Sequence, residues 1–291
     1  MAVYSISDLE KLTGIRAHTI RAWEQRYGII EPRRTAANIR YYQDDDLREL
    51  LNIALLNRNG YRISKIARMP PRERSQRIAD LTSLNVSPDT QLDALTLSTV
   101  EMDEFTFSHI VDTNVQQRGF EETMLEVIYP FLDKLGVLYF TGSIAPVQEA
   151  LISNLIRQKI LAATDRLPPR PREPAAPTFA LYLPEGERQE LSLLFIQYLL
   201  RKRGFPTVYL GPDTAPKDLG DAARCTHLDY LFTVATTGFA AVREHCPDST
   251  LLVSGPFTEQ LAQRTAADER VRYIRGLREM LDFLDTITPA P

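Results

Sequence analysis

The chain has 291 residues, of which 25% are charged and 44% are hydrophobic, and its formal net charge is −4. This length suits two or three domains, each large enough to bury its own core. No apolar run reaches the roughly 18 residues of a membrane span, and the first residues, MAVYSISDLEKL, show no secretory leader pattern. We therefore expect a cytoplasmic protein without a membrane partner.

Charge is distributed unevenly along the chain. Residues 1–78 hold 15 Lys and Arg against 9 Asp and Glu, a net charge of +6, whereas the remainder holds 19 against 29, a net charge of −10. A basic module on an acidic body is typical of a protein that binds nucleic acid with one part only. Cys225 and Cys246 are too few for a disulfide framework or a cysteine-based metal site, and we expect both to be buried free thiols.

Two stretches rich in proline and charge divide the chain, MPPRERSQ at 69–76 and RLPPRPREPAAP at 166–177. Successive prolines stop helices and favour extended backbone, so both stretches are predicted linkers. The predicted fold is therefore multidomain. Its expected parts are a mainly helical basic domain at 1–70, a linker at 71–89, a helical bundle at 90–165, a second linker at 166–177 and an α/β domain at 178–291.

The segment YSISDLEKLTGIRAHTIRAWEQRYGIIEP predicts a helix, a tight turn and a second helix. A serine followed three residues later by an acidic residue, at Ser5 or at Ser7, offers a capping box, and Gly14 supplies the turn. The second helix, about residues 16–26, carries polar and basic side chains that can reach base edges and phosphates in a major groove. The following EPRRTAANIRYY predicts a two-stranded wing that grips the DNA backbone.

Other side chains of this domain have a structural interpretation. Ile20, Trp23 and Tyr27 recur at three- and four-residue spacing, so they are expected to face the core or support the helix, with Trp23 a packed aromatic rather than a DNA contact. The three consecutive aspartates at 44–46 are predicted to form the N-cap and first turn of a helix, where its dipole stabilises negative charge. No metal site is expected.

The order of these elements resembles a known family. TIRAWEQRYGIIEPRR, followed by NIRYY, an acidic helix start and NGYRISKIA, is similar to the winged helix-turn-helix of the MerR family of transcription regulators. The resemblance implies double-stranded DNA as the partner. It places Arg16, His18 and Thr19 nearest the bases and implies DNA contacts for Arg21 and for the wing. The predicted DNA-binding residues are Arg16, His18, Thr19, Arg21, Arg26, Arg34, Asn38, Arg40 and Tyr41.

The rest of the chain predicts a bundle and then a sheet. LEVIYPFLDKLGVLYF and ALISNLIRQKILAA have the periodicity of helices, whereas FALYLP, TVYLG, YLFTVAT, TLLVSG and VRYI are short strand-like runs separated by helical patterns. Alternation of this kind predicts a flavodoxin-like, doubly wound parallel sheet of five strands. Ligands of such sheets bind at the carboxyl ends of the strands, and the charged turn PEGERQE follows the first strand there.

These two segments resemble the cobalamin-binding module of methionine synthase and of the CarH group of light-sensing repressors. The similar stretches are PFLDKLGVLYFTGSIAPVQEALISN, LPEGERQELS and VSGPF. That group has Trp, nine residues, then Glu-His in the bundle, where this chain has Tyr139 and Glu149-Ala150. Where the resemblance expects the axial histidine of a Glu-x-His-x-x-Gly setting, this chain has Gln189, whose amide is a poor ligand for cobalt. His109 is expected to lie on a helix face or in the core and not to act as a ligand.

The leading interpretation is a sequence-specific DNA-binding transcription regulator, not an enzyme, that forms a homodimer or higher homo-oligomer. Two roles stay open for its C-terminal part. It is either a sensor of a small molecule other than cobalamin or a module that docks a protein effector, and no cofactor is expected because Gln189 and Ala150 replace histidines. A simpler interpretation is that the acidic residues of the turn, including Glu190, only form the solvent-exposed start of a helix. The candidate effector pocket consists of Tyr139, Glu149, Glu187, Arg188 and Gln189.

Two alternatives remain at this point. One is a light- or cobalamin-responsive regulator that binds corrinoid without an axial histidine. The other is a cobalamin-dependent enzyme subunit. The sequence opposes the enzyme, because it contains no paired base and nucleophile and no glycine-rich phosphate loop.

Overall fold

The computed structural model describes residues 4–34, 38, 40–70, 73–74, 77, 88–140, 144–168, 176–187, 189–234, 239–255 and 268–287. The chain divides into two compact units, Met1–Leu155 and Ile156–Pro291. Most of the two predicted linkers lies outside the described residues, so the domain boundaries stay a prediction. No helix in the described part of the chain is long and apolar enough to cross a membrane.

The first unit begins with the expected winged helix-turn-helix. Ser5 and Asp8 form the capping box of the first helix, with Ser5 N donating to Asp8 Oδ2 (2.8 Å) and Asp8 N to Ser5 Oγ (3.2 Å). Gly14 ends that helix with a φ of 67°, a left-handed conformation that glycine adopts without strain. The elements are α1 (Ile6–Thr13), α2 (Ala17–Tyr27), β1 (Arg33–Arg34), β2 (Arg40–Tyr41), α3 (Asp44–Arg58) and α4 (Ile63–Ile66).

The hydrophobic core of this module packs against the inward face of α2. Ile20 is fully buried, and Trp23 packs against a cluster of Ile53, Leu56, Ile66 and Met69, which confirms the packed role predicted for the indole. The aspartates at 44–46 form the first turn of α3, as expected, although the N-cap is the preceding glutamine.

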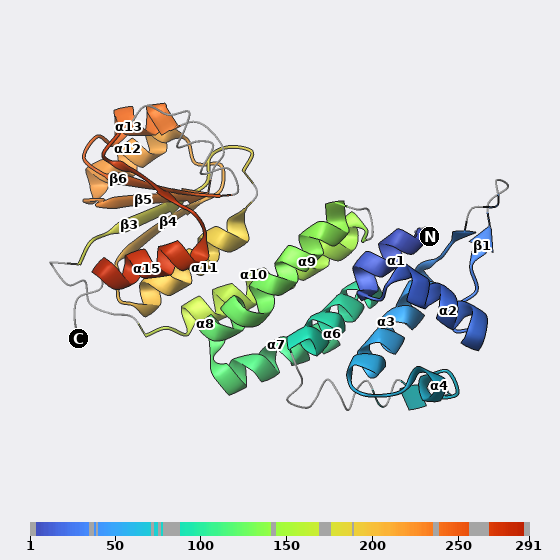
Figure 1. The fold of residues 1–291 in the computed structure, drawn as a ribbon. Helices are drawn as coiled ribbons and strands as arrows, with labels where there is room; N and C mark the ends of the chain where they lie inside the picture. The colour runs from blue at the N-terminus through green and yellow to red at the C-terminus, as the bar shows by residue number, and fades with distance from the viewer. Residues whose placement is uncertain are drawn as a thin grey trace. The chain divides into compact units, whose positions relative to one another are not determined.

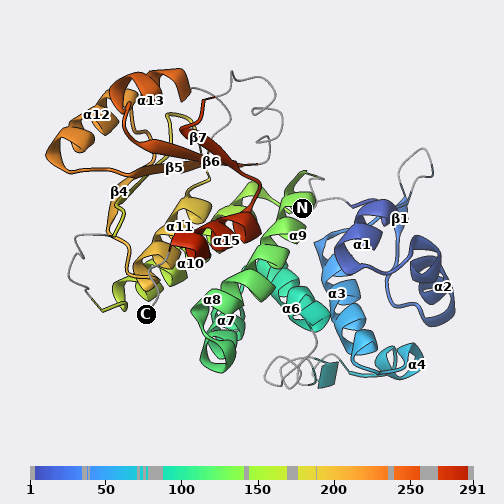
Figure 2. The ribbon, with the colours of Figure 1, turned by 60° about the vertical axis from the view of Figure 1, so that its left-hand side comes forward.

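Helices complete the first unit. They are α6 (Pro88–Glu101), α7 (Glu104–Arg118), α8 (Phe120–Thr123), a π-helical turn (Met124–Ile128), α9 (Tyr129–Phe140) and α10 (Pro146–Asp165), and the division between the units falls within α10. Figures 1 and 2 both show α3 between α2 and α6. The bundle therefore packs on the side of α3 away from α2.

The second unit contains the predicted sheet. All five strands are parallel, in the order β4-β3-β5-β6-β7, which is the flavodoxin-like arrangement expected from the sequence. The order reverses at β3, the strand that precedes the charged turn. The elements are β3 (Phe179–Tyr182), α11 (Glu190–Lys202), β4 (Thr207–Gly211), α12 (Pro216–Cys225), β5 (Tyr230–Val234), α13 (Phe239–His245), β6 (Thr250–Ser254), β7 (Val271–Ile274) and α15 (Leu277–Ile287).

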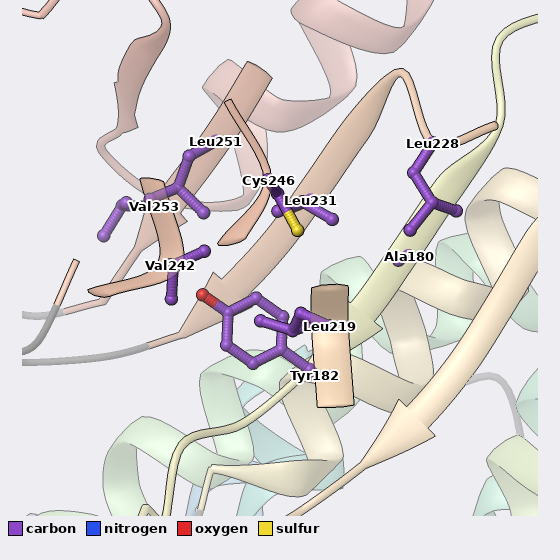
Figure 3. Packing of buried hydrophobic residues seen from close by; sticks show 9 residues of the cluster. All are labelled: Ala180, Tyr182, Leu219, Leu228, Leu231, Val242, Cys246, Leu251 and Val253. Carbon is purple, nitrogen blue, oxygen red and sulfur yellow. The ribbon is translucent and has the colours of Figure 1, made fainter. Parts of the chain in front are cut away.

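Helices cover both faces of this sheet. Figure 3 shows Tyr182 and Cys246 among aliphatic side chains on the α12 and α13 face, and Figure 1 shows α11 and α15 on the other. Burial raises the pKa of the Cys246 thiol. Cys225 is a free thiol but is exposed, so the expectation that both thiols are buried was wrong for this one. It lies six residues after the buried Leu219 on α12, which turns it away from the buried stripe.

Candidate nucleic-acid interface and effector edge

The turn between α1 and α2 is held by side chains of α1. Glu10 Oε2 accepts a hydrogen bond from Ala17 N (3.1 Å), which satisfies one of the free amides at the start of α2. Thr13 Oγ1 donates to Leu9 O (2.7 Å) and accepts from Ile15 N (3.2 Å). These bonds stabilise the turn between α1 and α2.

The outward face of α2 is basic and exposed. The side chains of Arg16, His18, Arg21 and Arg26 are exposed, whereas Thr19 is half-buried. Arg26 also lies over the ring of its neighbour Tyr27, with Cζ 5.6 Å from the ring centroid. The predicted DNA contacts of α2 are thus presented to the surroundings, while its apolar face forms the core.

The wing is the predicted antiparallel pair, with Arg33 opposite Tyr41 and Arg34 opposite Arg40. Arg34 Nη1 donates to Asn38 Oδ1 (2.7 Å), and Asn38 adopts a φ of 63°, which asparagine tolerates better than most residues. Both side chains are exposed. Residues 35–37 and the neighbouring Ile39 lie outside the described residues.

Glu24 connects the wing to α2. Its Oε1 lies 3.6 Å from Arg40 Nε, and its Oε2 accepts a hydrogen bond from Tyr42 OH (3.3 Å). Burial, and then the charge and hydrogen bond of Glu24, raise the pKa of Tyr42 to about 12. Arg40 therefore forms an ion pair within the protein, and its contact with DNA stays a prediction. Sequence reasoning missed Glu24, whose signal was an acidic side chain within a basic helix.

At the edge of the sheet, the turns after β3 and β4 are tied together. Thr214 N donates to Leu183 O (3.0 Å), and Gly186 N donates to Asp213 Oδ1 (3.3 Å). Gly186 has a φ of 82°, and Asp213 has a φ of 57°. The charged turn that follows β3 is thus anchored by its backbone.

Glu190, the first residue of α11, makes two contacts in the second unit. Its Oε2 lies 2.7 Å from Arg157 Nη2 of α10, and its Oε1 accepts from Tyr209 OH of β4 (3.4 Å). Burial, and then the charge of Glu190, raise the pKa of Tyr209. The reading of Glu190 as a solvated helix start was therefore wrong. The sequence carried no signal for this cluster, because its members come from three separate elements.

The structure places the candidate effector residues in different units. Tyr139, at 45% exposure on α9, and Glu149, which accepts from Ser153 Oγ (2.6 Å) on α10, belong to the first unit, as does the exposed Ala150. Glu187 and Gln189 are half-buried in the second unit. Arg188 lies outside the described residues, so the pocket that would join these side chains stays a prediction.

The donor groups at this edge do not suit a histidine-ligated cobalamin. Gln189 is the N-cap of α11 and makes no capping hydrogen bond, and the described side chains near it in the sequence include the carboxylates of Glu187 and Glu190. All four histidines of the chain lie elsewhere. His18 is on α2, His109 stacks on Phe105 of α7 (6.2 Å between ring centroids), His227 lies 3.1 Å from Asp229 Oδ1 before β5, and His245 ends α13. Carbonyl and carboxylate oxygens suit harder ions than cobalt.

Among the described residues, no three histidine, cysteine or acidic side chains are grouped so that they could hold a metal ion.

Comparison with known proteins covers the DNA-binding module and most of the chain. Residues 4–72 match the family of MerR HTH regulatory proteins. The HTH-type transcriptional repressor CarH of Myxococcus xanthus is 30% identical over 242 residues, which cover 80% of this chain and 79% of CarH. The repressor CarA of the same organism is 30% identical over 217 residues, covering 72% of this chain and 68% of CarA.

A solved structure, a cobalamin-binding protein from Desulfitobacterium hafniense DCB-2, is 15% identical and covers 70% of this chain and 100% of its own, with a TM-score of 0.35. The relatives that share most of this chain's length are thus transcriptional regulators and not enzymes. From its winged helix-turn-helix and the extent of its identity with CarH and CarA, the chain belongs to the MerR family of DNA-binding transcription regulators.

Proposed function

We propose that this regulator binds a pseudo-palindromic operator as a homodimer or higher homo-oligomer, with α2 in the major groove and the wing on the DNA backbone. The observation that supports this most directly is the set of exposed arginines on α2 and the first wing strand. Figure 2 shows α2 on the side of α3 away from α6. Arg16, His18 and Thr19 stand at the start of α2, the end of a recognition helix that reads bases. Arg21 and Arg26, further along, are proposed to neutralise phosphates.

We propose oligomerisation because the DNA interface of a single copy is small. A single short helix contacts few base pairs, and two copies on two half-sites multiply the specificity. Half-sites would then lie about one helical turn, 34–36 Å, apart or a multiple of this. Light scattering on the full chain and its DNA complex, with a footprint on a selected operator, tests this stoichiometry. A monomer bound to a single half-site would contradict it.

The phosphate role of Arg21 has a direct test. The full-length protein selects duplexes from a random library, and fluorescence anisotropy then measures affinity across a salt series. We expect Arg21→Ala to weaken binding to every duplex by about tenfold and to lower the salt slope by about one.

Arg224→Ala is the matched control for that variant. It also removes one guanidinium, but from the exposed end of α12 in the second unit. The control should bind as the unchanged protein does. Binding that is insensitive to salt, or the same loss in both variants, would count against the proposed interface.

For the C-terminal part, we propose that it senses an effector and that it does not hold cobalamin through a histidine ligand. The side chains of the turn after β3, including Glu187 and Gln189, offer oxygen acceptors and an amide rather than an imidazole. Such groups suit a polar small molecule or the basic surface of a protein antagonist. Tyr139 and Glu149 of the bundle are proposed to face the same ligand, and the protein is proposed to act in the cytoplasm.

Adenosylcobalamin is the probe that tests this proposal. The protein is incubated with it in the dark and in the light, desalted, and examined by absorption spectroscopy. We expect no retained corrinoid absorbance. Gln189→His supplies the missing imidazole, and retention by that variant alone would identify position 189 as a ligand position. Retention by the unchanged chain would instead show corrinoid binding without a histidine ligand and overturn the proposal.

A further inference from the structure

A buried carboxylate joins the DNA-binding module to the helical bundle within the first unit. Asp93, on α6, has a side chain that is 1% exposed. Its Oδ2 pairs with Arg58 Nη1 at the end of α3, and its Oδ1 lies 3.1 Å from Lys134 Nζ of α9. One buried anion thus holds two cations, one from each side of the junction.

Arg58 also contacts the helix-turn-helix. Its Nη2 donates to Thr13 O (2.7 Å), the carbonyl of the last residue of α1. The guanidinium lies against Gly14, so closely that a Cβ at that position would collide with it. Arg58 therefore joins Asp93 of the bundle to the turn from which α2 departs. A guanidinium suits this position because its fork of donors can bond two acceptors in fixed directions.

Weaker contacts accompany this one along the same junction. Asn59 Nδ2 donates to Thr90 Oγ1 (3.2 Å), and Arg48 Nε lies 3.2 Å from Glu101 Oε1. They hold α3 against the two ends of α6. The Asp93 contact continues through Arg58 to the backbone of the helix-turn-helix at Thr13 O.

Burial of the carboxylate gives this contact weight. Asp93 is 1% exposed, so loss of a cation would leave its charge uncompensated in a poorly solvated place, whereas Arg58 and Lys134 are 34% and 23% exposed and keep some contact with water. The position of α6 is therefore coupled to the position of Arg58, and through it to the turn. Lys134 extends the coupling to α9, the helix that also carries the candidate effector residue Tyr139.

We infer that Asp93 is a positioning residue for DNA binding. By holding Arg58 on Thr13 O, it sets the angle of α2, and by pairing with Lys134 it makes that angle depend on the bundle. This inference rests on the proposed role of α2 in the major groove. It adds a route, from α9 through Asp93 and Arg58, by which the bundle controls the DNA-binding module.

Asp93→Asn in the full-length protein tests the inference. Asparagine keeps an acceptor oxygen but loses the charge that holds both cations. We expect affinity for a selected operator to fall by about tenfold, within the range typical of coupling between sites, and the salt slope to become shallower as phosphate contacts are lost. The matched control is Asp133→Asn, an exposed aspartate next to Lys134 on α9, which changes the net charge equally. The control should bind like the unchanged protein.

Arg58→Lys separates positioning from stability. Lysine keeps a positive charge beside Asp93 but lacks the second arm that reaches Thr13 O. We expect its melting temperature to stay near that of the unchanged protein while its DNA affinity falls. This variant decides the question alone if Asp93→Asn does not fold. Folded Asp93→Asn or Arg58→Lys with unchanged affinity and salt slope would overturn the inference, whereas failure of the unchanged protein to bind DNA would refute the proposed interface instead.

Discussion

The two regions of this molecule contain the same trio of side chains, a glutamate that pairs with an arginine and accepts from a tyrosine. In the DNA-binding module, Glu24 lies 3.6 Å from Arg40 and 3.3 Å from Tyr42 OH. At the edge of the sheet, Glu190 lies 2.7 Å from Arg157 and 3.4 Å from Tyr209 OH. Each trio ties a helix to a strand, so in both places a carboxylate serves as a joint between elements.

The difference lies in what surrounds each joint. Around Glu24, the cations of α2 are exposed, so the region turns positive charge outward and keeps its anion inside. Around Glu190, the arginine is committed to the glutamate. A surface of the first kind is prepared for an external polyanion. At the second joint, by contrast, the charge of the arginine already has a partner within the protein.

The largest effect that we expect concerns the tyrosine of the first joint. The pKa of Tyr42 is raised to about 12 in the folded protein from 10.0, so folding favours the neutral phenol. Its stabilisation is fully present below pH 10 and is lost as the pH rises from 10 through 12, by about 3 kcal/mol in all. Urea unfolding followed by fluorescence of the single tryptophan, Trp23, reports on this module.

Tyr42→Phe is the control for that titration. It has no ionisable hydroxyl, so the module's stability should fall less between pH 10 and 12 than in the unchanged protein. Equal loss in both proteins would assign the alkaline transition to other groups.

A smaller effect tests whether Glu24 acts as a joint or only as a charge. Glu24→Gln removes an anion near DNA, which by Coulomb attraction alone would strengthen binding. We expect the opposite, a loss of about tenfold, because Arg40 and the second wing strand lose their partner on α2. Fluorescence anisotropy on the selected operator measures it.

Glu31→Gln is the matched control, since Glu31 is an exposed carboxylate just before the wing. Its removal should leave affinity unchanged or slightly increased. If both variants bind more tightly, the positioning role of Glu24 is refuted.

The smallest effect belongs to the second joint. Glu190→Gln leaves Arg157 without its counter-charge, but Arg157 is 43% exposed, so water replaces much of the interaction. We expect a loss of about 0.5–1 kcal/mol in the second unit and no change in DNA affinity. Hydrogen exchange at the start of α11 measures the loss of stability. The control is Glu185→Gln, at an exposed glutamate of the same turn. A large loss of operator affinity would mean that the two joints are not independent.

Local signals made the secondary structure predictable. The Ser5 capping box, the left-handed Gly14 and the spacing of Ile20 and Trp23 act over a few residues, so they identified the helix-turn-helix correctly. Short β-branched runs alternating with helical patterns likewise predicted the parallel sheet. The same reasoning left a solvent-exposed helix start open as an interpretation of Glu190, because a helix start favours negative charge whether or not a partner is near.

The side-chain joints were beyond the reach of such reasoning. Tyr42 lies 18 residues from Glu24, Arg58 lies 35 from Asp93, and Asp93 lies 41 from Lys134. Pairs at these separations form only when helices pack in a particular way. Nothing in the spacing distinguishes Asp93 from an aspartate on a solvated helix face.

The sequence by itself determined the order of elements, the basic character of the DNA-binding module and the lack of a histidine in the turn at 183–190, because each is a property of residue type and short-range spacing. Only the tertiary structure decided which charges are used internally. It turned Arg40 inward to Glu24, paired Glu190 with Arg157 and buried Asp93 between two cations. Burial changes the free energy of a charge according to the neighbours that packing supplies, and those neighbours come from distant parts of the chain.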